Sequence, residues 1–423
     1  MFRRNQVIWL PCVMLALASS GAAADPAPTT LKQAFEAAWQ RQPETLSQQM
    51  RQEAAAAQQQ AATRWTAEPV ALELSTKTDR LNQNLGRDET VAGINIPLWL
   101  PGERTRTGAV ADAQARAANS RVRAAQLRTA AHVREAYWAW QRARIDHVLA
   151  GELFGHAQQL AKDVGKRVQA GDLARADQHQ ADGAMASAEV ALAEATGALA
   201  TTAQRLRALS GQVPQVPAAG TSGGRVVGVI GAEPMPVLPA DSATLMATHP
   251  AVAELQDSAD VAQRSAELAQ VQTRANPELT LATSRDRGQS DEAYQHSITL
   301  GIRIPLGSSS SNQAKRASAQ ADAMEAQAQV RLESERLQGE VEAARVGLVS
   351  AQTQLAAAQR RALLARESRV FFQKSFQLGE TDLPTRLRME REAMDAERQA
   401  ARSGIDLAAA QSALRQTLGL LPE

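Results

Sequence analysis

Residues 164–178, VGKRVQAGDLARADQ, contain the one plausible break in the longest helix-forming stretch of the chain. That stretch runs from Gly102 to Gly211, contains no proline, and is dense in Ala, Arg, Gln and Glu. Glycine commonly follows the end of a helix, and a following Asp can cap the next helix. The pair Gly171-Asp172 therefore predicts a turn between two helices.

The two predicted helices are much longer than a globular core needs. At about 1.5 Å per residue, residues 103–168 would span about 100 Å and residues 173–210 about 57 Å. Helices of globular proteins typically run for roughly 8–20 residues. The opening helical segment of about 34 residues, 31–64, would supply roughly the missing length if it stacked on the shorter helix. We therefore expect two helical columns of equal length in an elongated molecule.

The same pattern occurs twice in the chain. One constant offset separates Pro69 from Pro277, Pro97 from Pro305 and Gly171 from Gly379, which indicates two duplicated units. We expect the following organisation: a signal peptide at 1–24; a first repeat at 25–210, with a strand pair at 69–98 and a helical hairpin at 103–210; an inter-repeat strap at 211–241; and a second repeat at 242–423, with a strand pair at 277–305 and a helical hairpin at 311–418.

Each predicted strand pair has one apolar face and a polar loop between its strands, at 80–89 in the first pair and 286–294 in the second. Apolar residues alternate with polar or small ones, as in Leu72 and Leu74, Ile94 and Ile96, Leu279 and Leu281, and Ile298, Leu300, Ile302 and Ile304. Period-two alternation is typical of strands, and about 10 residues suffice for a tilted strand to cross a bilayer. Soluble hairpins covering a core are the alternative.

The long helix predicted after the second strand pair has a heptad seam. It begins at Leu337 and Val341 and continues through Ala344, Leu348, Ala351, Leu355, Ala358 and Ala362.

Four strands cannot close a membrane barrel alone, because every strand edge in lipid needs a partner. Two chains would give eight strands and a barrel filled by side chains, whereas three would give twelve and leave a lumen. The expected fold class is therefore mainly α with a small membrane β part. A long α-helical barrel would continue from four β-strands per chain that contribute to a shared 12-strand trimeric barrel.

Composition excludes several classes of protein. Arg3 and Arg4, the apolar run 7–18 and the A-x-A site at Ala22–Ala24 predict a cleaved export signal, which contains the only cysteine, Cys12. The formal net charge of +1 gives no electrostatic footprint for nucleic acid. No later run is long and apolar enough for a transmembrane helix. No catalytic motif, cofactor motif or metal-ligand cluster appears, so we expect no enzyme, no cofactor and no metal site.

The duplicated order of a helix, Pro43-Glu44, the Pro69 strand, Ile96-Pro97, a long arm and the Gly171-Asp172-Leu173 turn resembles the TolC-like outer-membrane efflux family. Within that family the chain looks most like the outer-membrane component of heavy-metal (cobalt–zinc–cadmium type) resistance-nodulation-division pumps. The resemblance implies a homotrimeric channel through outer-membrane lipid, with a helical tunnel across the periplasm. It also implies a periplasmic adaptor (membrane fusion protein) and an inner-membrane pump as partners.

The resemblance and the turns together give the candidate site residues. Gly171, Leu173, Leu378, Gly379 and Leu383 are expected at the adaptor-docking tip. The acids Asp172, Asp177, Glu380 and Asp382 are expected to charge its entrance and favour cations. Arg167, Arg175 and Arg386 are expected to latch the closed tip.

The expected function is a passive exit duct for divalent heavy-metal cations, opened by adaptor and pump docking. Two alternatives remain open. The duct could serve organic drug efflux or type I protein secretion, or the chain could be a periplasmic coiled-coil adaptor without a pore.

Overall fold

The computed structural model describes residues 30–81, 84–214, 232–238, 242–306 and 310–423. The predicted signal peptide and most of the predicted strap lie outside these residues. The elements in chain order are α1 (Leu31–Gln40), α2 (Pro43–Thr63), β1 (Ala71–Thr78), β2 (Asp88–Pro97), α3 (Glu103–Ala170), α4 (Arg175–Ser210), α5 (Ser242–Thr248), α6 (Pro250–Val271), β3 (Glu278–Arg287), β4 (Gln295–Arg303), α7 (Ser310–Gln377) and α8 (Leu383–Thr417).

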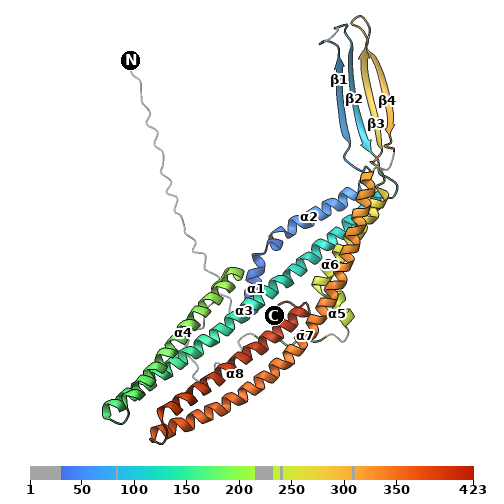
Figure 1. The fold of residues 1–423 in the computed structure, drawn as a ribbon. Helices are drawn as coiled ribbons and strands as arrows, with labels where there is room; N and C mark the ends of the chain where they lie inside the picture. Colours follow the sequence, from blue (N-terminus) through green and yellow to red (C-terminus); the bar gives the residue numbers. More distant parts are fainter. Residues whose placement is uncertain (1–29, 82–83, 215–231, 239–241, 307–309) are drawn as a thin grey trace, which may run out of the picture.

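The molecule is elongated, with the four strands at one end and the two hairpin turns at the other (Figure 1). Helices α3 and α7 have 68 residues each and run from the sheet to the turns. Helix α2 packs on α3 in the half nearest the sheet, and α4 packs on α3 in the half nearest the turn (Figure 1). Since α1 also contacts α4, two shorter helices together accompany the long one. The fold class predicted for one chain, mainly α with four strands, is confirmed.

The strands differ from the prediction at their loop ends. Residues 80–89 were expected to form a polar loop, but β2 already begins at Asp88 and pairs with Thr78. Similarly, β3 continues to Arg287, past the expected loop start at Asp286. Ladder hydrogen bonds come from the backbone, so strands continue pairing where their side chains have become polar.

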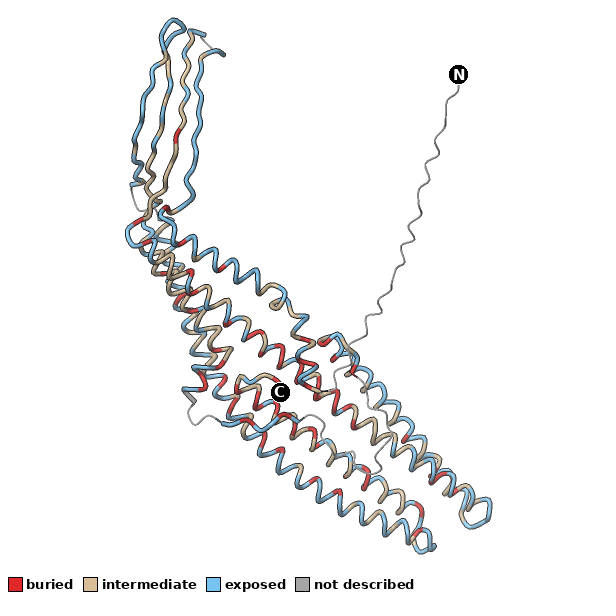
Figure 2. Tube along the Cα trace, turned by 180° about the vertical axis from the view of Figure 1, so that it is seen from behind, coloured by how far each residue is buried: buried red, intermediate tan, exposed pale blue. Residues whose placement is uncertain are grey.

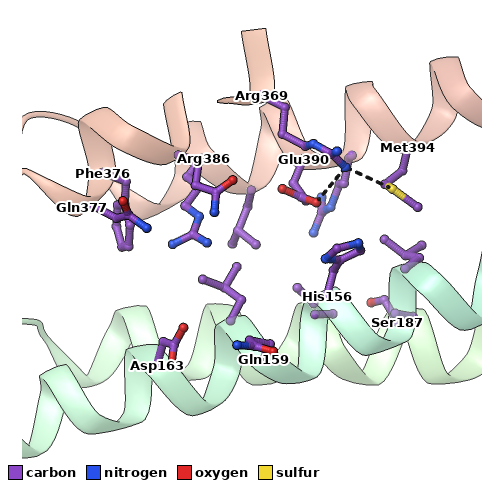
Figure 3. Close-up of a pocket in the computed structure, with 18 of the residues that line it drawn as sticks. His156, Gln159, Asp163, Ser187, Arg369, Phe376, Gln377, Arg386, Glu390 and Met394 are labelled. Carbon is purple, nitrogen blue, oxygen red and sulfur yellow. Dashed lines mark hydrogen bonds and ion pairs between the residues drawn. The ribbon is translucent and has the colours of Figure 1, made fainter. Parts of the chain in front are cut away.

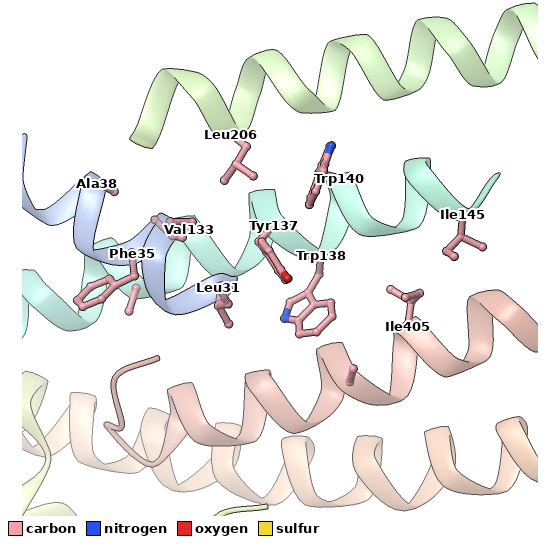
Figure 4. Close-up of a cluster of buried hydrophobic side chains, with 13 residues drawn as sticks. Leu31, Phe35, Ala38, Val133, Tyr137, Trp138, Trp140, Ile145, Leu206 and Ile405 are labelled. Carbon is pink, nitrogen blue, oxygen red and sulfur yellow. The ribbon is translucent and has the colours of Figure 1, made fainter. Parts of the chain in front are cut away.

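The largest core lies halfway along the helices, where α1 crosses α3 beside α4 and α8 (Figure 4). Trp140 and Tyr137 are among the largest fully buried side chains, and Leu31 and Leu206 pack against them. Tyr137 and Trp138 meet edge to face with ring centroids 5.1 Å apart. Figure 2 shows buried residues concentrated in this middle region, whereas in the sheet the outer strands β1 and β4 are exposed and the inner strands β2 and β3 are mostly of intermediate burial. The core thus fixes the junction between α1 and α4.

A buried ion cluster joins the inter-repeat segment to the helices beside this core. The carboxylate of Glu233, which has no exposed side-chain surface, accepts from Arg134 of α3 at 2.6 and 3.1 Å. Arg415 of α8 lies 3.3 Å from the same carboxylate, and the Ser412 hydroxyl donates to it. Buried charges are stable only when paired in this way. Glu233 therefore holds the described part of this segment between α3 and α8.

The predicted seam of α7 faces the protein interior. Leu337, Val341, Leu348, Ala351, Ala358 and Ala362 are buried, and Ala344 and Leu355 are half-buried. Small seam residues allow helices to approach closely, and α8 packs along this face. Among the described residues, no helix combines the length and the apolar character that a membrane crossing requires.

Candidate functional site

The two ends of the molecule have different chemistry. At one end is a sheet whose strands pair antiparallel in the order β1-β2-β3-β4. Side chains of one pairing row point to the same face, and neighbouring residues along a strand point to opposite faces. The register aligns three apolar rows on one face: Ile96, Leu279 and Ile302; Leu72, Ile94, Leu281 and Leu300; and Leu74, Ala92, Thr283 and Ile298.

These apolar rows are not covered by other elements of the chain. Leu72 and Leu74 are 70% exposed, and Leu300 is 73% exposed. Contiguous apolar surface of this kind marks contact with a membrane or another protein. The predicted alternative of soluble hairpins over a core is wrong for this chain, because no described element packs on this face.

The opposite face of the sheet carries a polar network. Asn95 Nδ2 donates to the Glu73 carboxylate at 3.0 Å, and Thr280 Oγ1 donates to Asn95 Oδ1 at 2.8 Å. Further along, the hydroxyls of Ser284 and Ser297 are 2.6 Å apart. The sheet is thus apolar on one face and hydrogen-bonded on the other. Strands β1 and β4 each have one neighbour, so both edges of the sheet are free in the single chain.

At the other end, both hairpin turns use the same glycine-ended helix motif. Gly171 (φ +86°) and Gly379 (φ +79°) adopt the left-handed conformation that glycine tolerates without strain. Asp172 N–H donates to the carbonyl of Arg167 at 2.9 Å, and Gly171 N–H donates to that of Val168 at 3.1 Å. The second turn repeats both bonds, from Glu380 to Ser375 at 3.0 Å and from Gly379 to Phe376 at 3.2 Å.

The predicted docking residues divide into exposed and buried ones. A Cβ at Gly171 or Gly379 would meet nothing within 4 Å, and Leu378 is 75% exposed. In contrast, Leu383 is only 2% exposed and Leu173 is half-buried, and both pack in an apolar cluster below the turns. The side chain of Leu383 therefore stabilises the tip in this conformation and is not available to a docking partner.

The predicted acids also divide into two groups. Asp172 and Glu380 are exposed at the turns. Asp177 accepts from the N–H of Ala174 at 3.0 Å, and Asp382 caps α8 by accepting from the N–H of Thr385 at 3.3 Å. A hydrogen bond from the Thr385 side chain lowers the pKa of Asp382. Two of the four acids therefore have local structural roles, and the ring stays a prediction.

Two of the three predicted latch residues meet on one aromatic ring. The guanidinium carbons of Arg167 (α3) and Arg386 (α8) lie 5.2 and 4.8 Å from the ring centroid of Phe376 (α7). Arg167 also donates to the Phe376 carbonyl at 3.4 Å. These contacts join the first hairpin to the second within one chain. Arg175 is exposed at the first residue of α4 and takes no part in them.

Phe376 was not predicted as a site residue. A sequence signal existed, because the chain has only six Phe and three of them, Phe371, Phe372 and Phe376, lie just before the second turn. Burial of Arg386 beside this ring lowers the pKa of its guanidinium. Among the described residues, no group of three or more His, Cys, Asp or Glu side chains is placed to hold a metal ion.

Comparisons with known proteins agree with this geometry. The model of a family described as outer membrane efflux protein matches residues 34–212. Among solved structures, CusC, described for its folding and transmembrane channel formation, has a TM-score of 0.76 at 19% identity over 92% of both chains.

Two further solved structures of outer membrane proteins are similar over most of their length. The Campylobacter jejuni CmeC outer membrane channel has a TM-score of 0.72 at 14% identity, over 92% of this chain and 85% of that one. The outer membrane protein VceC of Vibrio cholerae has a TM-score of 0.72 at 18% identity, over 93% and 97%. No curated protein matches by sequence. These likenesses show that the chain has the fold of such channels.

Proposed function

We propose that three copies of this chain form a passive exit duct in the outer membrane of a Gram-negative bacterium. The observation that carries the proposal is the sheet with one exposed apolar face, one polar face and two free edges. Lipid leaves no strand edge unpaired, so β4 of one copy would pair with β1 of the next. Twelve strands would then place the apolar rows toward lipid and the Glu73–Asn95 network toward a lumen.

The helices would extend this cylinder into the periplasm. Their turns lie at the end farthest from the sheet and leave Gly171, Gly379 and Leu378 exposed (Figure 1). We place the docking of a periplasmic adaptor at these residues. An inner-membrane pump of the resistance-nodulation-division type would then supply the energy, since a passive duct needs no catalytic group of its own.

The proposed cargo is a divalent heavy-metal cation. The exposed acids Asp172 and Glu380, repeated in three copies, would lower the energy of a cation at the entrance. The cargo is tested in a strain that lacks its own duct and carries this chain instead. Its growth is compared on plates with zinc, cobalt or cadmium and on plates with organic drugs. Restored growth on drugs alone would assign the duct to drug efflux.

The competing function, a periplasmic adaptor without a pore, leaves the apolar face of the sheet unexplained. An adaptor lies in water or against the inner membrane, where Leu72 and Leu300 would be costly to expose. Membrane fractionation separates the two functions, because a duct sediments with the outer membrane.

Docking at the turns is tested by the variants Gly171→Leu and Gly379→Leu. An added Cβ would meet no atom of its own chain within 4 Å at either position, so the backbone strain at positive φ is the effect that a control must match. The matched control is Gly102→Leu, because Gly102 (φ +77°) has the same backbone strain but lies at the sheet end of α3. We expect the tip variants to lose resistance and the control to keep it at equal expression. Unchanged resistance in both tip variants would contradict docking there.

A further inference from the structure

A cavity of about 850 Å³ lies between the two helical hairpins, a short distance from the turns (Figure 3). Its lining comes from both hairpins and combines charged and polar side chains with apolar ones, among them Leu153, Leu160, Leu387 and Met394. Cavities of roughly 300–1,000 Å³ with an apolar lining and a few convergent polar groups are typical of small-molecule sites. The cavity therefore has the size of a binding site, and its apolar part can hold the body of a ligand.

The charged groups of its lining include more cations than carboxylates: Lys166 and four arginines face Asp163, Glu390 and Asp395. Arg386 extends from α8 toward the opposite hairpin (Figure 3), and its Nε is buried without a hydrogen-bond partner. In the described part of the chain, no carboxylate lies within 4.0 Å of Arg386 or Arg167, although Arg369 in the same wall pairs with Glu390 at 3.6 Å. Burial lowers the pKa of Arg386, and the opposing effect of the negative charges on Glu390 and Asp163, which raises it, is smaller.

The guanidiniums of Arg167 and Arg386, which have no carboxylate partner within 4.0 Å in the described part of the chain, converge on the ring of Phe376. Both lie over or beside this ring, at 4.8 and 5.2 Å from its centroid. An anionic group between them would receive charge-assisted hydrogen bonds, which guanidinium forms best with planar carboxylates and similar oxyanions. The apolar body attached to that group would lie along Leu160 and Leu387.

We propose that this cavity binds a small amphipathic organic anion, a carboxylate or sulfonate on an aromatic or aliphatic body, with Arg167 and Arg386 as the anion-binding residues. Such a ligand contacts both hairpins at once. By linkage it stabilises the conformation in which the hairpins lie together. The site is a property of one chain and does not depend on the proposed duct.

The test is isothermal titration calorimetry of the full mature protein with naphthoate and with its neutral amide, naphthamide. We expect naphthoate to bind about tenfold or more tightly than naphthamide, because only the acid forms charge-assisted bonds. Arg386→Gln should weaken naphthoate binding by a similar factor and leave naphthamide binding unchanged. Arg388→Gln is the matched control, because Arg388 is exposed on the same helix and does not line the cavity.

Three results would overturn the proposal: no saturable binding of naphthoate, equal affinity for acid and amide, or an equal loss in the Arg388→Gln control. If Arg386→Gln does not fold, as judged by its circular dichroism spectrum, Arg167→Gln carries the same test. Arg167 approaches the Phe376 ring from the first hairpin, whereas Arg386 approaches it from the second. Arg167→Gln should therefore also weaken the binding of naphthoate and leave the binding of naphthamide unchanged.

Discussion

A single charge placed on the apolar face of the sheet provides a strong test of its orientation. Leu300 lies in the middle of the three apolar rows, opposite Leu281, and is 73% exposed. In a membrane barrel that row lies near the centre of the bilayer, where an outward-facing Arg costs about 2–4 kcal/mol. We therefore expect Leu300→Arg to lower the free energy of unfolding by about 2–4 kcal/mol per chain.

The neighbouring residue provides the matched control. Thr299 is exposed on the same strand but faces the polar side, where a barrel would hold water. We expect Thr299→Arg to cost about 1 kcal/mol or less, since lumen-facing substitutions avoid lipid. Both variants can be refolded into lipid vesicles and titrated with guanidinium chloride. Equal losses, or a larger loss for Thr299→Arg, would refute the assignment of the apolar face to lipid.

Three other predictions concern the helical part. Glu233→Ala leaves the buried Arg134 without a carboxylate and Arg415 with Glu423 alone, so it should lower the free energy of unfolding by about 3–5 kcal/mol. The exposed Glu380→Ala should change it by about 0.5 kcal/mol or less, and chemical denaturation compares the two variants. Burial lowers the pKa of His249 from its ordinary 6.5, so the unfolded chain binds more protons at this residue than the folded chain does. Thermal stability should therefore fall as the pH drops from about 7.5 through 6.5, and His249→Gln should reduce this pH dependence. Trp140→Ala leaves a cavity in the central core and should lower the free energy of unfolding by about 3–5 kcal/mol. Chemical denaturation of the variant and of wild type at the same pH measures this difference.

The pH prediction has a local structural reason. Neutral His249 caps α6, because its Nδ1 accepts from the N–H of Ala251 at 3.3 Å. Protonation converts this acceptor into a donor and breaks the cap. Of the nearby charges, Glu333 favours the protonated form and Arg336 opposes it, but burial is the larger effect. A stability that rises on acidification would contradict this reasoning.

The fold could be predicted from the sequence wherever one local rule decided it. Alternation in β3 and β4 assigned Leu281 and Leu300 to one face, and the register aligns them. Glycine at 171 and 379 identified both turns, because only a left-handed residue ends these helices so abruptly. The seam of α7 followed from its spacing, and its residues face the interior.

The site could be predicted less well, because it depends on contacts between hairpins. Nothing local in the sequence brings Arg167 and Arg386 to one ring; that contact exists only once α3 of the first hairpin packs beside α8 of the second. Leu383 looked available because it follows the turn, but its position in the first turn of α8 points it into the cluster below. Glu233 had no periodicity around it and showed its role only through its buried partners.

The mass of the complex extracted from the outer membrane in mild detergent tests the central proposal most directly. Native mass spectrometry should give three times the mass of one mature chain, because four strands per copy then close a barrel of twelve. A particle with the mass of one chain that remains folded, with the free edges of β1 and β4 exposed, would contradict the shared barrel and the duct with it.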